Sequence, residues 1–283
     1  MVRRVVPPAH SRWQAQAGAF ARRLLRQYAR SPVSLLFLVA WPAFWYLLVA
    51  HLLFEAASGG ARTVATAKAA FAVSFGLFGA FTVSLTGVIG AFTADVATKR
   101  YRKFRSLPVA PSADLVGRLA GGVALATGSY AGLLAIGLLD GAAFGLRRPW
   151  SPAVVGVSLV AFVAVGIAVA IGLAVLVPRP QQATALATAV LLASFFGTGF
   201  NGVSPGLFPG PAWLLNVIPV SLIGRLHLAH LVAPAAADAA AFGPPALPTH
   251  PAALVAVVAY GVGSVALAAG VLARAAYRGE VGE

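Results

Sequence analysis

Long runs without a charged residue alternate with short polar segments along this chain. Six such runs cover about residues 31–54, 69–94, 119–139, 153–177, 183–200 and 252–273. Each holds about 18 residues or more, and a helix of that length crosses a hydrocarbon core of ~30 Å. Pro42 interrupts the first run, which a membrane helix tolerates. The pattern predicts an all-α membrane protein whose six transmembrane helices occupy residues 31–275.

The segment before the first run, residues 1–30, carries an amphipathic stretch from Arg12 to Arg30. Apolar and aromatic residues recur on one helical face at Trp13, Ala17, Phe20, Leu24 and Tyr28. A second face carries Arg22, Arg26 and Arg30. Aromatic and arginine faces of this kind predict a helix that lies in the cytoplasmic interface of an anionic leaflet. The alternative is a basic flank that only sets the orientation of the first span.

The segment between the fifth and sixth runs, residues 201–251, is rich in glycine and proline. Its apolar part, residues 213–231, is broken by polar residues and by Pro219. A seventh span is one interpretation of this part. A pair of short re-entrant helices in the outer leaflet fits the spacing of proline and glycine better, and we expect that arrangement.

Composition narrows the class of protein further. The chain has 283 residues, of which 59% are hydrophobic and 10% are charged, whereas soluble domains average about 25% charged residues. Too few polar side chains are present to cover a water-soluble globule of this size. The absence of cysteine excludes disulfides, thiolate metal sites and cysteine nucleophiles.

The formal net charge of +14 has two interpretations, nucleic-acid binding or the lysine and arginine excess of cytoplasmic loops. With six spans, sixteen of the 21 basic residues fall on one side: seven in the N-terminal segment, six between Lys99 and Arg118, and Arg179, Arg274 and Arg278. The positive-inside rule then predicts that both termini, including the tail 276–283, are cytoplasmic in a cell-membrane protein. Nucleic acid is not an expected partner.

The connection between the second and third runs is the strongest candidate for a functional segment. Its basic residues alternate with aromatic residues and then meet a Leu-Pro turn, and the candidate docking residues are Lys99, Arg100, Tyr101, Arg102, Lys103, Phe104, Arg105, Leu107 and Pro108. A basic surface of this kind can steer and dock a cytosolic protein. A flank that binds lipid headgroups is the main alternative, and nucleic-acid binding is a third.

This layout resembles the membrane subunit of type-2 ABC transporters, the exporter class of permeases. The sequence RSLPVAP at residues 105–111 is similar to the family's turn after span two, although the Glu-Arg-Gly that precedes it in the family is replaced by residues 97–100. The family likeness implies that this loop contains a coupling helix that enters a cleft of an ATPase subunit. It also implies a second permease subunit, either identical or different.

A second similarity to the family lies in the external region. It comprises Gly199, Pro205, Pro209, Trp213, Pro219 and Arg225, which together with Asn201 form the expected external re-entrant segment. The family shows an Asn-Pro-like turn here, whereas Asn216 stands three residues before Pro219.

No glycine-rich phosphate loop ending in Gly-Lys occurs, because none of the three lysines follows a glycine. We therefore expect no enzyme activity and no cofactor in this chain, with ATP and Mg²⁺ bound by the separate ATPase.

The expected function is ATP-driven export. Alternatives are an ATP-independent channel or secondary carrier, or a membrane-embedded structural or enzymatic protein. A carrier is disfavoured because the six runs hold no acidic residue or lysine for a coupling ion. An enzyme would need a catalytic cluster, and the candidate formed by Arg225, His227, His230 and Asp238 offers two histidines without a placed carboxylate, which make a weak metal site.

Overall fold

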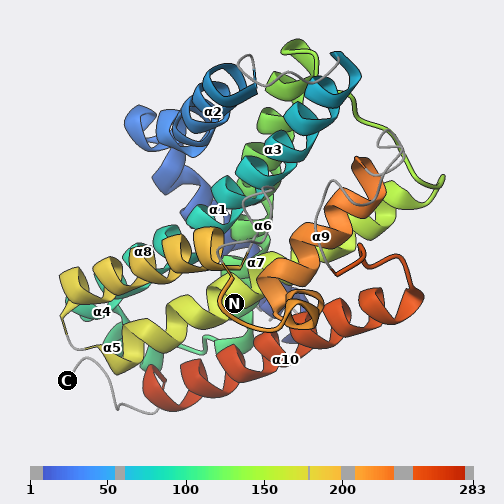
Figure 1. Cartoon of the computed structure of the whole chain (residues 1–283). Helices are drawn as coiled ribbons and strands as arrows, with labels where there is room; N and C mark the ends of the chain where they lie inside the picture. The colour runs from blue at the N-terminus through green and yellow to red at the C-terminus, as the bar shows by residue number, and fades with distance from the viewer. Residues whose placement is uncertain (1–8, 55–60, 178, 199–207, 233–244, 278–283) are drawn as a thin grey trace.

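The structure is a computed structural model, and it describes residues 9–54, 61–177, 179–198, 208–232 and 245–277. Within these ranges the chain is helical and contains no strand (Figure 1). The elements, in chain order, are α1 Ala9–Ala29, α2 Pro32–Phe54, α3 Ala61–Thr82, the π-helical turn η1 Val83–Gly87, α4 Val88–Ala97, α5 Arg100–Arg105, α6 Pro111–Leu139, α7 Ser151–Leu176, α8 Pro180–Gly197, the 3₁₀ turn η3 Ala212–Asn216, α9 Pro219–Leu231 and α10 Pro251–Ala275.

Five of the described helices are long and apolar enough to cross a membrane. They are residues Pro32–Leu52, Ala61–Ala97, Pro111–Leu139, Ser151–Leu176 and Pro251–Ala275. The fifth predicted span corresponds to α8, which has 18 residues and begins with Pro180, Gln181 and Gln182. These polar residues lower its mean hydropathy, so a sixth span stays a prediction. The all-α membrane class agrees with the five apolar helices.

The second span is a single 37-residue helix in which α3, η1 and α4 are continuous. Hydroxyl groups around the π-helical turn donate to carbonyl oxygens one turn earlier, as Thr82 does to Phe78 at 2.8 Å and Thr86 to Thr82 at 2.6 Å. Such bonds loosen the regular ladder of a helix, and π-helical turns of this kind often mark functional sites.

Burial is distributed very unevenly among the spans. In the most apolar window of the second span, 83% of residues are buried inside the protein, compared with 22% for α2 and 17% for α10. On α2, Phe37, Trp41, Phe44 and Trp45 form a row of neighbouring rings that stay partly exposed. In water, apolar patches of this extent are unusual. They suit contact with lipid or with another protein chain.

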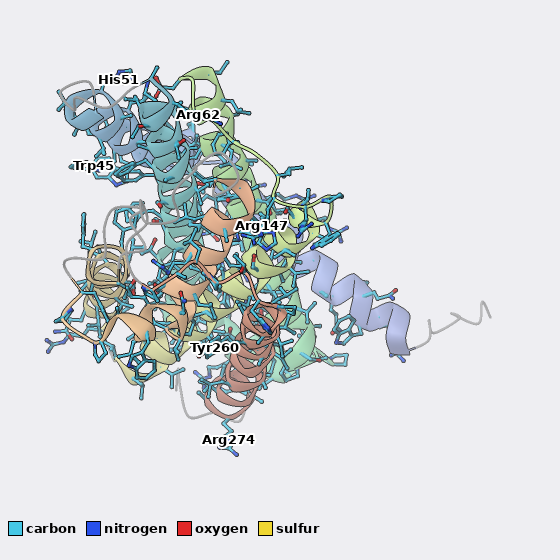
Figure 2. All side chains as sticks on the ribbon, turned by 45° about the vertical axis from the view of Figure 1, so that its right-hand side comes forward. Trp45, His51, Arg62, Arg147, Tyr260 and Arg274 are labelled. Carbon is cyan, nitrogen blue, oxygen red and sulfur yellow. The ribbon has the colours of Figure 1, made fainter. Side chains whose placement is uncertain are left out.

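Polar and charged side chains lie at both of the opposite ends of the molecule. Figure 2 places His51 and Arg62 at one end and Arg274 at the opposite end. This arrangement follows from α2 and α3, which meet at the first end, and from α10, which finishes at the second. The carboxyl end of α10 lies near α5, because Tyr277 reaches Asp114 beside it.

Candidate functional site

The basic connection after the second span folds as a short helix between two tight turns. Lys99 adopts a left-handed conformation with φ 53° and ends the turn after α4. Helix α5 then covers only Arg100–Arg105. Pro111 begins α6 at the start of the first turn, where a backbone N–H has no partner within the helix, so the N–H that proline lacks is not missed. The expected coupling segment therefore contains a six-residue helix that connects the ends of two long helices.

The nine candidate docking residues divide into an outward and an inward group. Lys99, Arg102, Lys103, Leu107 and Pro108 are exposed, and the apolar side chain of Leu107 is 55% exposed. Arg105 is half-buried. By contrast, Tyr101 is 2% exposed, and Phe104 packs edge-on against Phe20 of α1 with ring centroids 5.5 Å apart. Arg100 is exposed but binds Asp95. Any docked partner would therefore meet the outward group.

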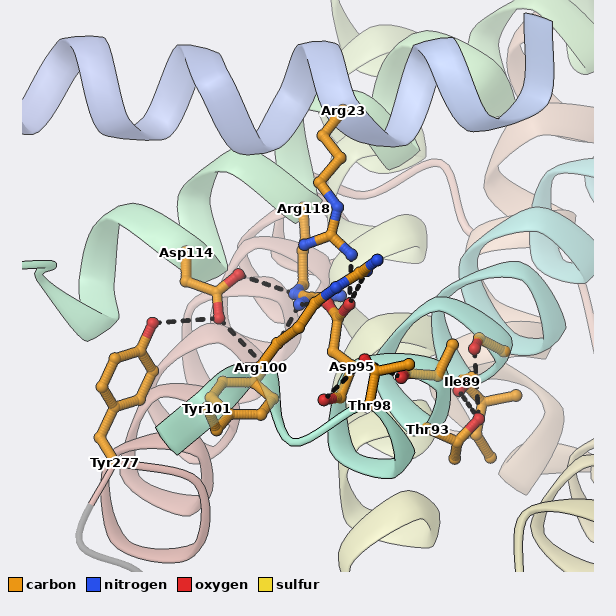
Figure 3. Close-up of polar contacts among 12 residues, drawn as sticks. Arg23, Ile89, Thr93, Asp95, Thr98, Arg100, Tyr101, Asp114, Arg118 and Tyr277 are labelled. Atoms are coloured by element: carbon orange, nitrogen blue, oxygen red, sulfur yellow. Dashed lines mark hydrogen bonds and ion pairs between the residues drawn. The ribbon is translucent and has the colours of Figure 1, made fainter. Parts of the chain in front are cut away.

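A buried carboxylate beneath α5 collects three arginines from three different helices. Asp95 of α4 is 1% exposed and accepts hydrogen bonds from Arg100 at 2.7 Å and from Arg118 of α6 at 2.7 Å. Arg23 of α1 donates to the same carboxylate (Figure 3). This convergence ties the amphipathic helix, the second span and the third span together at one point.

A second buried carboxylate extends this ion network to the carboxyl end of the chain. Arg118 Nε donates to Asp114 at 2.8 Å, and the Tyr101 and Tyr277 hydroxyls donate to the same carboxylate at 3.1 and 3.3 Å. Burial raises the pKa of both tyrosines, so their hydroxyl groups keep the protons that they donate. We call Arg23, Asp95, Arg100, Tyr101, Asp114, Arg118 and Tyr277 the junction cluster.

Helix α1 lies against the protein through the face that the sequence assigned to the membrane interface. Ala17 and Leu24 are buried there, and Trp13 donates to Ser112 at 3.0 Å. Contact is close because Gly117 and Gly121, one turn apart on α6, carry no side chain. The opposite face leaves Arg22, Arg26 and Arg30 exposed. Location of α1 in the membrane interface stays a prediction.

The sequence does not predict the junction cluster, because a charged residue limits each apolar run, so Asp95, Asp114 and Arg118 fall outside the runs. The expected absence of acidic residues from the spans is therefore wrong. The helix of the second span continues through Asp95, and the helix of the third span begins at Pro111 and includes Asp114. Each of these two helices therefore carries a buried carboxylate. The Asp114 and Arg118 spacing of four residues was the available signal. Nothing local indicates that Asp95 joins them, since that contact depends on how the helices pack.

The external segment is only partly described. Gly199, Asn201 and Pro205 lie outside the described residues, whereas Pro209 and Trp213 are exposed. Pro219 begins α9, a 13-residue helix that is buried among α3, α7 and α10. Arg225 on α9 is 5% exposed and donates to Asn216 at 2.9 Å, which holds η3 beside α9. Placement of this pair as re-entrant helices in the outer leaflet stays a prediction.

The two histidines of α9 face different partners. The ring nitrogens of His227 lie 2.8 Å from the hydroxyls of Tyr130 and Ser158, and His230 lies 2.8 Å from Ser151. Asp238 lies outside the described residues. Among those described, no group of three or more His, Asp or Glu side chains is arranged to hold a metal ion. The α9 histidines thus link helices α6, α7 and α9.

A separate polar cluster connects α2 to its neighbours at the other end of the bundle. Asp140, at the end of α6, accepts from the Tyr46 hydroxyl at 2.9 Å and from Lys68 at 3.2 Å, and His51 Nε2 lies 2.9 Å from it. Burial by itself would raise the pKa of Asp140. The hydrogen bonds from Tyr46 and Lys68 and the nearby cationic groups outweigh it and lower that pKa.

Acidification is expected to weaken the cluster around Asp140. A carboxyl group with a lowered pKa in the folded state adds stability above its usual pKa of 3.8 and loses that contribution as the pH falls through the lowered value. Unfolding in detergent should therefore show Asp140→Asn to be less stable than wild type at pH 7. The difference should narrow as the pH falls from about 5 to 3. A constant difference across this range would contradict the ionised cluster.

Comparison with known proteins assigns this chain to no family. No protein-family model matches the chain, and no curated protein matches it.

Proposed function

We propose that this chain is the membrane-spanning permease subunit of an ATP-driven exporter whose ATPase is a separate polypeptide. Support comes from the apolar helices and from the resemblance of residues 105–111 to the coupling turn of type-2 ABC permeases. The observation that carries the proposal is the position of α5. This helix presents a basic outer surface and is anchored from beneath by the buried junction cluster.

The anchoring provides a physical route for coupling. Tyr101 of α5 bonds to Asp114 and accepts a hydrogen bond from Arg118 at 3.2 Å, so α5 is tied directly to α6. Arg100 ties it to α4 and Tyr277 ties α6 to the chain after α10. A partner that moves α5 on ATP binding would therefore move the ends of several helices together, because buried charged groups resist separation.

The exposed sides of α2 and α8 suit a dimer of permease subunits. On α8, only Ala183, Ala187, Leu191 and Phe195 are buried, one residue per turn. The rest of α8 and the aromatic row of α2 are available for lipid or for a second copy of this chain or a similar one. In this proposal the two subunits enclose the export pathway, and both termini face the cytoplasm.

Charge reversal on the outer surface of α5 tests the proposal. We expect Arg102→Glu/Lys103→Glu to abolish co-purification of a chain with a phosphate-binding loop and to abolish the ATP hydrolysis that co-purifies with the wild-type protein. Both side chains are exposed and make no ion pair within the described residues, so the variant should insert and fold normally. The matched control is Arg147→Glu/Arg148→Glu, which changes the charge equally in the loop before α7.

Two results would count against the proposal. Retained ATPase binding by the α5 variant would remove α5 as the docking element. Export from cells or proteoliposomes that needs no ATPase would instead favour a channel or secondary carrier.

A further inference from the structure

A groove of about 420 Å³ lies between the first half of α2 and the π-helical turn of the second span. Its α2 side is formed by Phe37, Trp41 and Pro42, and its opposite side includes Thr82, Thr86 and Gly90. Ligand pockets commonly measure about 300–1,000 Å³, so the groove is large enough for part of a small amphiphile.

The walls of this groove suit an apolar guest. The hydroxyls of Thr82 and Thr86 donate to carbonyl oxygens of their own helix and need no further partner. Trp41 and Phe37 add aromatic surface. The groove is open beside Gly90, because a Cβ atom added there would meet no atom within 4 Å. An acyl chain fits such walls, since it makes no hydrogen bonds and gains from leaving water.

The groove continues into a basic hollow beside α1. Gln27 and Ala91 border both spaces. The hollow, of about 660 Å³, is lined by Arg22, Arg23, Arg26, Arg30 and Arg100. Asp95 beneath it already binds Arg23 and Arg100. Arg22, Arg26 and Arg30 form no ion pair with any described residue, so an unneutralised positive charge faces the mouth of the groove.

We propose that the groove and hollow together bind one anionic phospholipid of the surrounding leaflet. An acyl chain would lie along Trp41 and Thr86, and the phosphate would lie at Arg26 and Arg30. Arginine suits a phosphate because its planar guanidinium donates two parallel hydrogen bonds. A leaflet lipid is favoured over a soluble ligand because the groove runs beside α2, whose most apolar part is only 22% buried and whose exposed apolar side chains suit contact with a bilayer.

The site depends on membrane insertion and not on ATP-driven export. The hollow lies on the side of α1 that faces away from α6, and none of the outward residues of α5 lines the hollow or the groove. Loss of lipid binding and loss of ATPase binding are therefore measured on different variants.

Fluorescence quenching in detergent micelles tests the assignment. Phosphatidylglycerol with brominated acyl chains is titrated at low mole fraction against phosphatidylcholine with the same chains. The signal is the quenching of wild type minus that of Trp41→Phe, which isolates the groove tryptophan. We expect half-saturation at about a tenfold lower mole fraction for phosphatidylglycerol, because arginines near the headgroup attract an anionic lipid, an attraction that salt partly screens.

Two pairs of variants test separately how the site binds the headgroup and how it binds the acyl chain. Arg26→Gln/Arg30→Gln should abolish most of the tenfold preference, whereas Arg102→Gln/Lys103→Gln, with the same change of charge, should leave it intact. Gly90→Phe should fill the groove and remove saturable quenching by either lipid. Gly156→Phe, also an exposed glycine with no atom within 4 Å of an added Cβ, is its control.

Three outcomes would overturn the proposal. Equal quenching by the two lipids, or a preference that survives Arg26→Gln/Arg30→Gln, would show that the arginines do not select the headgroup. Undiminished quenching in Gly90→Phe would place the chain outside the groove. Stronger binding of a brominated fatty acid than of phosphatidylglycerol would assign the site to a single-chain amphiphile.

Discussion

Arg118→Met is expected to lower the free energy of unfolding by about 3–5 kcal/mol, the usual effect of removing one partner from a buried ion pair. Arg118 is 4% exposed and binds both Asp95 and Asp114. Without it, Asp114 would keep only the hydroxyls of Tyr101 and Tyr277, so its charge would be buried without a counter-charge. Urea-induced unfolding in detergent micelles measures the change.

Two companion variants identify the cause of this loss. Arg100→Met removes another arginine from Asp95, but the Arg100 side chain is 44% exposed, so its loss should cost less than about 1 kcal/mol. Adding Asp114→Asn to Arg118→Met should restore part of the stability, because the stranded charge is then gone. If the single variant unfolded like wild type, the carboxylates would not share a buried arginine.

The helices themselves were largely predictable, and the reason is physical. A span must bury its backbone hydrogen bonds in lipid, so it must be a long apolar helix, and a long apolar run is visible in the sequence. The predicted runs correspond to α2, α3 with α4, α6, α7, α8 and α10. Their ends were less predictable. A charged residue ends an apolar run in the sequence, but Asp95 and Arg118 neutralise each other across helices, so α4 and α6 continue through them.

The candidate site was predictable only as a segment. Composition alone marks residues 99–108 as basic and exposed, yet it does not separate Arg102, which faces outward, from Tyr101, which is buried. The apolar face of α1 is likewise predictable from the sequence only in part. Its helical spacing identified one contact face, but an apolar face can lie on lipid or on protein. The glycines at 117 and 121 that favour protein contact sit on α6, almost a hundred residues away.

Gly117→Val is expected to detach α1 from the bundle. A Cβ atom at residue 117 would lie 2.5 Å from the carbonyl oxygen of Ala17 and 2.5 Å from the Cβ of Phe20. The first of these is backbone, so the whole helix must move, and overpacking of this kind costs about 1–3 kcal/mol. A loss of about 1.4 kcal/mol makes the detached state of α1 about tenfold more populated. We therefore expect tryptic cleavage within residues 12–30 to become about tenfold faster. Mass spectrometry of the digest gives the rate.

Gly128→Val on the same helix is the matched control, because an added Cβ there meets no atom within 4 Å. It should leave the cleavage rate unchanged. Displacement of α1 also separates Arg23 from Asp95 and Phe20 from Phe104, two of the contacts that hold α1 against α4 and α5. If α5 is the docking element, Gly117→Val should therefore weaken recovery of the ATPase although no docking residue has changed. Normal recovery together with fast cleavage would show that α5 keeps its position without α1.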